Sequence, residues 1–109
     1  MTDVAAQIRR HFRMAFSLSE EAIERLTETS RTALGEGLAA LGASLDASDS
    51  GEAARWAHSV KGTLLNAGLA GLAEGIAAIE QGIARGETGE ARSRLDAVED
   101  GLRAFLNGH

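Results

Sequence analysis

No proline occurs anywhere in the 109 residues of this sequence, and this absence constrains the fold more than any other feature. Proline breaks helices because it lacks a backbone N–H and its ring clashes with the preceding turn. The chain is instead rich in Ala, Leu, Glu and Arg, which favour helix, and has few β-branched residues. Hydrophobic residues make up 44% and charged residues 25%, a balance typical of folded domains. We therefore predict an all-α fold and exclude an all-β one.

The charge balance and the cysteine count exclude several function classes. The chain contains eleven Lys and Arg residues and sixteen Asp and Glu residues, so its net charge is −5. This charge disfavours binding to nucleic acid, which needs a basic face. With no Cys, the chain cannot form disulfides, Fe–S clusters or thiolate zinc sites. No apolar run is long enough for a membrane span, and the start, MTDVAAQIRRHF, lacks the apolar core of a signal peptide. We expect a cytoplasmic protein that binds neither nucleic acid nor membrane.

Apolar residues recur at helical spacing in five stretches. These stretches run from Val4 to about Phe16, from near Ser17 to Asp46, from Asp49 to about Asn66, from about Leu69 to Arg85, and from Gly89 to Leu106. Because the connections are short, successive helices should lie antiparallel. The sequence predicts one domain over residues 1–109: an antiparallel up-and-down four-helix bundle at about 17–106, with a short N-terminal helical extension at about 4–16.

Capping residues mark the ends of these stretches. Thr2 or Asp3 is placed to cap the first helix. The segment S-L-S-E from Ser17 has the form of a capping box, with a glutamate three residues after the serine. Asp49 can cap the third helix, and Gly68 suits the left-handed conformation that ends it.

The third stretch holds an unusual group of residues, His58, Lys61 and Gly62. On a helix His58 falls at the edge of the core stripe, and the other two residues follow it by one turn. Lys61 is the only lysine among the 11 basic residues, and it puts a compact ammonium beside the imidazole. Gly62 costs the helix about 1 kcal/mol relative to alanine, and its missing side chain would let another backbone or a bulky phosphoryl donor come close. The expected core stripe comprises Ala53, Ala57, Val60 and Leu64.

Glu80 occupies the position that mirrors His58 across the Gly68 turn. His58 is ten residues before Gly68, and Glu80 is twelve residues after it. Antiparallel packing across the turn would bring Glu80 level with His58. A carboxylate there could accept a hydrogen bond from Nδ1–H, which would fix the tautomer and leave Nε2 as the nucleophile.

This pattern resembles the histidine phosphotransfer (HPt) domain family. The resemblance extends from about Leu38 to Leu106 and includes the acidic turn D-S-G-E before the His-bearing helix. The features that carry it are A-H-S-V-K-G around His58, Gly68 ten residues later, Leu72 four residues further on, and the pair Ile79-Glu80.

The resemblance implies a four-helix bundle that receives a phosphoryl group on His58 and exchanges it with an aspartate of a response-regulator receiver domain. It implies that Lys61 stabilises the phosphoryl charge, that Gly62 gives the partner access, and that Glu80 orients the imidazole. Glu80 matches the carboxylate of chemotaxis-kinase members, whereas many other members have Gln there. The second histidine of chemotaxis-type members is replaced by Ala77, which favours a general phosphorelay protein.

The implied partners are a receiver domain and a sensor or hybrid histidine kinase, and we expect a monomer. The Mg²⁺ for the transfer should belong to the receiver domain, because this chain offers no clustered oxygen ligands. No cofactor is therefore expected here. We predict a phosphocarrier rather than a kinase, without ATP-dependent activity, since no Gly-rich nucleotide loop is present.

A different class of function fits the same helical pattern. The chain could be a helical adaptor that binds a receiver or kinase domain without phosphotransfer. His11 and His109 have no neighbours like those of His58, and we expect both to be dispensable. Arg9, Arg10 and Arg13 form either a solvated face or a docking surface for an acidic partner.

Overall fold

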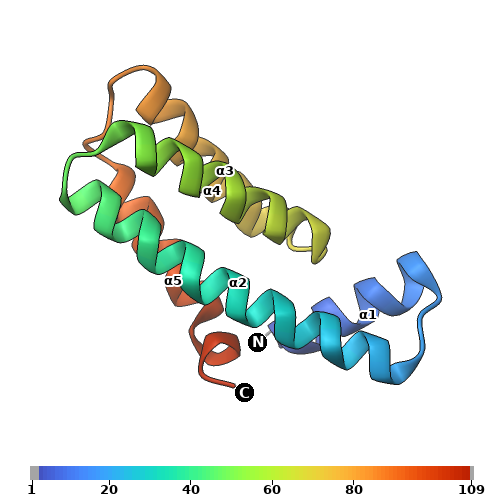
Figure 1. Ribbon diagram of the computed structural model, residues 1–109. Coiled ribbons are helices and arrows are strands. Elements are labelled where there is room, and N and C mark those ends of the chain that lie inside the picture. The colour runs from blue at the N-terminus through green and yellow to red at the C-terminus, as the bar shows by residue number, and fades with distance from the viewer. Residues whose placement is uncertain (1–2, 109) are drawn as a thin grey trace.

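The computed structural model describes residues 3–108, and these residues form five α-helices and no strand (Figure 1). The helices are α1 (Val4–Phe16), α2 (Glu20–Asp46), α3 (Ser50–Asn66), α4 (Ala70–Ala84) and α5 (Ala91–Leu106). The predicted all-α fold is confirmed. In this part of the chain, no helix is both long and apolar enough to cross a membrane.

Aspartates cap the N-termini of helices α1 and α3, as predicted. The Asp3 carboxylate accepts a hydrogen bond from the backbone N–H of Ala6 at 3.3 Å, and Asp49 accepts one from Glu52 at 3.1 Å. Each carboxylate satisfies a backbone donor that the first turn of a helix leaves without a partner. Thr2, the alternative cap of α1, lies outside the described residues.

The predicted start of α2 near Ser17 is wrong. The helix begins at Glu20, and its cap is Ser19, whose hydroxyl accepts a hydrogen bond from the backbone N–H of Ala22 at 3.2 Å. Ser17 instead ends α1 with φ 50° and ψ 42°, in the left-handed region. An N-cap needs extended backbone, so Ser17 cannot serve both ends.

Left-handed glycines end α3 and α4, which agrees with the predicted turns. Gly68 has φ +81° and Gly86 has φ +72°, conformations that are open to glycine because it has no Cβ. The two helices that follow these turns begin slightly later than the sequence predicts, at Ala70 and Ala91.

Four helices contact one another in a ring. Helix α2 contacts α3 and α5, and α4 contacts the same two helices from the other side (Figure 1). Helix α1 contacts α2 and α5. At one end of the α2–α5 pair, Arg31 Nε donates a hydrogen bond to the carbonyl of Phe105 at 2.7 Å; at the other end, Asp46 pairs with Arg92 at 3.8 Å.

The core consists mainly of aliphatic side chains from all five helices. The predicted stripe on α3 is fully buried. Helix α1 contributes Ile8 and Phe12, which are 0% and 5% exposed. The largest fully buried side chains are Phe105, Ile8, Ile23, Leu34, Leu41, Leu64, Ile76, Ile79, Leu95, Leu102, Val60 and Thr27. Because this core faces inward along α3, the opposite side of α3 is free to carry polar groups at the surface.

Candidate functional site

His58 stands on the outer side of α3, and its side chain is 75% exposed. Its Nδ1 atom lies 3.0 Å from Oε2 of Glu80 on α4. The turn at Gly68 joins the two helices, so the mirrored spacing in the sequence brings these residues level. Nε2 has no hydrogen-bond partner among the described residues and is open to solvent.

Lys61 shares the same carboxylate. Its Nζ atom lies 2.5 Å from Oε1 of Glu80, so each oxygen of Glu80 holds one group of α3. Lys61 and Glu80 are 27% and 26% exposed, which makes this pair more shielded than His58. The sequence pattern predicts the contact of Glu80 with His58 but not its contact with Lys61. The available signal was the position of Lys61, one turn from His58 and nearer the core stripe.

The charge of Glu80 follows from these contacts. The hydrogen bond from Lys61 lowers the pKa of the Glu80 carboxyl below its ordinary value; partial burial opposes this, and the hydrogen bond with His58 adds to it. Glu80 is therefore ionised at neutral pH and can only accept hydrogen bonds. Its contact with His58 requires a proton on Nδ1, which leaves the lone pair of a neutral imidazole on Nε2.

Gly62 lies one turn after His58, where a side chain would point into open space. A Cβ built on Gly62 meets no atom within 4 Å. The glycine is therefore not required by packing inside the protein. Leu65, on the same side of α3 and seven residues after His58, is 50% exposed. The surface beside the imidazole therefore has no side chain at Gly62 and an apolar side chain at Leu65.

The other two histidines lie elsewhere. His11 is on α1, where its ring packs against Phe12 and Phe16 with centroid separations of 5.9 and 6.2 Å. His109 lies outside the described residues. Within residues 3–108, no group of three or more His, Cys, Asp or Glu side chains could hold a metal ion.

The fold and this site together define a helical domain with a surface histidine held by a carboxylate of the neighbouring helix. A model of the Hpt domain family matches residues 21–108. Since this match covers most of the chain, the protein belongs to the Hpt domain family. Domains of this family take part in histidine phosphotransfer in phosphorelays and interact with the receiver domains and kinases of two-component systems. No significant match was found among curated proteins or among solved structures.

Proposed function

We propose that this protein is a phosphorelay carrier that accepts a phosphoryl group on His58 and exchanges it with an aspartate of a response-regulator receiver domain. The observation that carries the proposal is the contact of Glu80 with Nδ1 of His58, in a chain of the Hpt family. In the neutral imidazole that contact puts the proton on Nδ1 and the lone pair on Nε2, which is the form a nucleophilic imidazole needs.

The transfer step follows from this geometry. The Nε2 lone pair attacks the phosphorus of the aspartyl phosphate in line, an N–P bond forms, and the bond from phosphorus to the acyl oxygen breaks. The aspartate leaves as a carboxylate, and Nδ1 of His58 keeps its proton. The imidazole becomes cationic in this step, so the ionised Glu80 beside it stabilises the product. The Mg²⁺ that assists such transfers would belong to the receiver domain.

Lys61 and Gly62 have supporting roles in this proposal. Lys61 has three ammonium donors, of which Glu80 takes one, so the others can reach the equatorial phosphoryl oxygens. Gly62 keeps the approach to Nε2 free for the receiver domain. Both roles need positioning and charge rather than covalent chemistry, which is the general requirement of phosphoryl transfer.

We further propose that the whole chain acts as one domain built on an antiparallel four-helix bundle. The contacts of Arg31 with Phe105 and of Asp46 with Arg92 support opposite directions for α2 and α5. The contact of His58 with Glu80 across a short turn supports the same for α3 and α4. Helix α1 adds to the common core through Ile8 and Phe12.

The decisive experiment is incubation of the protein with a panel of phosphorylated receiver domains, with and without His58→Gln. Wild type should acquire an acid-labile, alkali-stable label, as a phosphoramidate is, and His58→Gln should fold normally and acquire none. His11→Gln serves as the matched control for the loss of a histidine and should still acquire the label, because His58 is unchanged in it. Label on His58→Gln, or no label on wild type with any receiver, would favour the adaptor function instead.

Two further variants test the supporting roles. Lys61→Ala should slow transfer about tenfold without abolishing it, because one charge contact in a partly exposed site contributes roughly 1–2 kcal/mol. Gly62→Gln should slow transfer from a receiver domain by blocking its approach. If Gly62→Gln accepts phosphate at the wild-type rate, the access role of Gly62 is wrong.

A further inference from the structure

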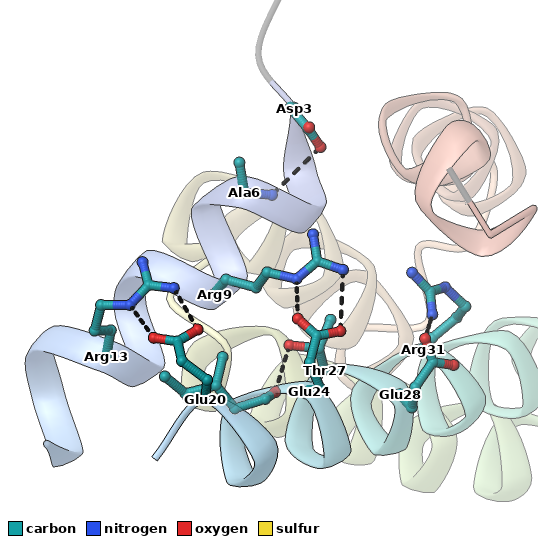
Figure 2. Close-up of polar contacts among 10 residues, drawn as sticks. Asp3, Ala6, Arg9, Arg13, Glu20, Glu24, Thr27, Glu28 and Arg31 are labelled. Atoms are coloured by element: carbon teal, nitrogen blue, oxygen red, sulfur yellow. Dashed lines mark hydrogen bonds and ion pairs between the residues drawn. The ribbon is translucent and has the colours of Figure 1, made fainter. Parts of the chain in front are cut away.

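Helix α1 precedes the segment matched by the Hpt family and lies against α2 and α5. Two ion pairs join it to α2, each with two hydrogen bonds: Arg9 with Glu24 and Arg13 with Glu20 (Figure 2). Its apolar side is buried in the core. These contacts fix which residues of α1 face away from α2.

The side of α1 opposite these ion pairs borders a groove at the α3–α4 turn. The groove has a volume of about 400 Å³ and is lined by Gln7, Arg10, His11, Met14, Ala15 and Gly68. His11 connects its two walls, because a Cβ built on Gly68 would lie only 2.5 Å from Cγ of His11. Helix α1 therefore contacts the turn of the hairpin that carries His58 through His11.

Two exposed residues of this groove contribute neither to the core nor to an ion pair within the described residues. Met14 is 77% exposed, more than any other large hydrophobic residue in the described chain. Arg10 is exposed and forms no ion pair among the described residues, whereas Arg9 and Arg13 on the same helix both do. Met and Arg are the side chains that protein interfaces favour, and Lys and Glu are those that they avoid.

The groove lies within reach of a partner bound over His58. Gly68 follows His58 by ten residues, which corresponds to about 15 Å at the helical rise. A typical interface buries about 800 Å² on each partner, a patch about 30 Å across. Leu65, which is half exposed, lies between His58 and Gly68 in the chain. A receiver domain centred on His58 would therefore extend to the groove.

The charge of this region differs from that of the remaining chain. Residues 1–19 contain three arginines and one aspartate, a net charge of +2, whereas the remaining residues contain eight basic and fifteen acidic side chains, a net charge of −7. Because Arg9 and Arg13 pair with Glu24 and Glu20 of α2, Arg10 supplies the positive charge of this helix that remains to attract an acidic partner surface, on a protein of net negative charge. Charge contrast of this kind steers encounter and selects partners.

We propose that this groove is a second docking surface for the receiver domain, which inserts an apolar side chain beside Met14 and a carboxylate beside Arg10. This inference rests on the proposed phosphotransfer function. In this proposal α1, which lies outside the matched family segment, selects among receiver domains. The contact at His58 alone would not distinguish them.

The test measures transfer kinetics with the phosphorylated receiver domain that labels wild type fastest. Arg10→Glu should raise the KM for that receiver about fivefold, and Met14→Ser about threefold, with kcat unchanged, because contacts at an interface rim affect encounter and binding. The effect of Arg10→Glu should shrink in about 0.5 M sodium chloride, where surface charges are screened. Arg25→Glu is the matched control: it reverses the charge of an exposed arginine of α2 outside the groove and should leave KM unchanged.

Chemical labelling with phosphoramidate, which needs no docking, separates this inference from the proposed function. All variants should react with phosphoramidate at His58 at the wild-type rate. Wild-type KM values for Arg10→Glu and Met14→Ser would overturn the docking surface and leave phosphotransfer intact. An equal rise in KM for Arg25→Glu, slower phosphoramidate labelling of the groove variants, or a change in their oligomeric state would also overturn it. Failure of every receiver to label wild type would contradict the proposed function itself.

Discussion

The α1–α2 pair and the α3–α4 pair are both joined by carboxylates that reach between helices, but the contacts leave different atoms free. In the α1–α2 pair, each glutamate accepts two hydrogen bonds from one guanidinium (Figure 2). In the α3–α4 pair, Glu80 divides its two oxygens between His58 and Lys61. The first arrangement pairs both carboxylate oxygens with two parallel N–H groups of one arginine, whereas the second leaves Nε2 of His58 and two ammonium donors of Lys61 available.

The difference shows how similar ion pairs can have different uses. Arg13 and Glu20 are 51% and 72% exposed, whereas Lys61 and Glu80 are 27% and 26% exposed. Exposed pairs contribute little to stability because water and salt screen them. We therefore infer that the charges of the α1–α2 pair orient α1 while its core residues hold it, and that the charges of the α3–α4 pair prepare His58 for reaction.

The largest expected effect tests what holds α1 in place. Phe12 is 5% exposed in the core, so Phe12→Ala should lower the free energy of unfolding by about 3 kcal/mol through lost burial and a residual cavity. Arg9→Ala, the control, removes a surface ion pair and should cost about 0.5 kcal/mol. Urea denaturation measures both. If Arg9→Ala costs as much as Phe12→Ala, then charge and not burial holds α1.

A smaller effect distinguishes two glycines of the α3–α4 pair. Gly68→Ala should lower the free energy of unfolding by about 2 kcal/mol, since φ is +81° and the new Cβ would meet His11. Gly62→Ala should raise it by about 0.5–1 kcal/mol, because Ala favours helix and its Cβ meets no atom within 4 Å. Thermal unfolding of the two variants gives the comparison. Destabilisation by Gly62→Ala would mean that this glycine serves the fold and not access.

Local patterns predicted much of this molecule. The stripe on α3 and the left-handed Gly68 follow from helical spacing and from residue chemistry, both of which are read within one helix and its ends. The level of Glu80 with His58 follows from the length of a single hairpin. The start of α2 was mispredicted because Ser17 and Ser19 both suit a cap, and only the end of α1 decides between them.

Contacts between distant segments could not be predicted in this way. Arg31 donates to the carbonyl of Phe105, 74 residues away, and its guanidinium lies 4.5 Å from the centre of that ring. His11 contacts Gly68 because α1 folds back against the end of the bundle. The Lys61 contact with Glu80 depends on the rotation of α4 about its axis. Each of these depends on how helices pack, which periodicity within a helix does not specify.

The smallest expected effect is a dependence of the free energy of unfolding on pH. Measuring it for variants of Glu80 and Glu20 compares the two carboxylates directly. Lys61 lowers the pKa of Glu80, and Arg13 lowers that of Glu20, from the ordinary value of 4.5. A carboxyl whose pKa is lowered by folding contributes stability above its ordinary pKa, and this contribution disappears as pH falls through the folded value. Wild type should therefore exceed Glu80→Gln and Glu20→Gln in stability at pH 7, and both differences should shrink below about pH 4.5.

Salt distinguishes the two carboxylates in the same urea titrations. At about 0.5 M sodium chloride the Glu20→Gln difference should shrink, because mobile ions screen charges that are exposed to water. The Glu80→Gln difference should persist, since Glu80 is only 26% exposed and its partner Lys61 only 27%. Equal loss of both differences in salt would mean that the α3–α4 pair is no better shielded than the α1–α2 pair. In that case Glu80 would not hold His58 any more firmly than Glu20 holds Arg13, and the orienting role of Glu80 would have to be abandoned.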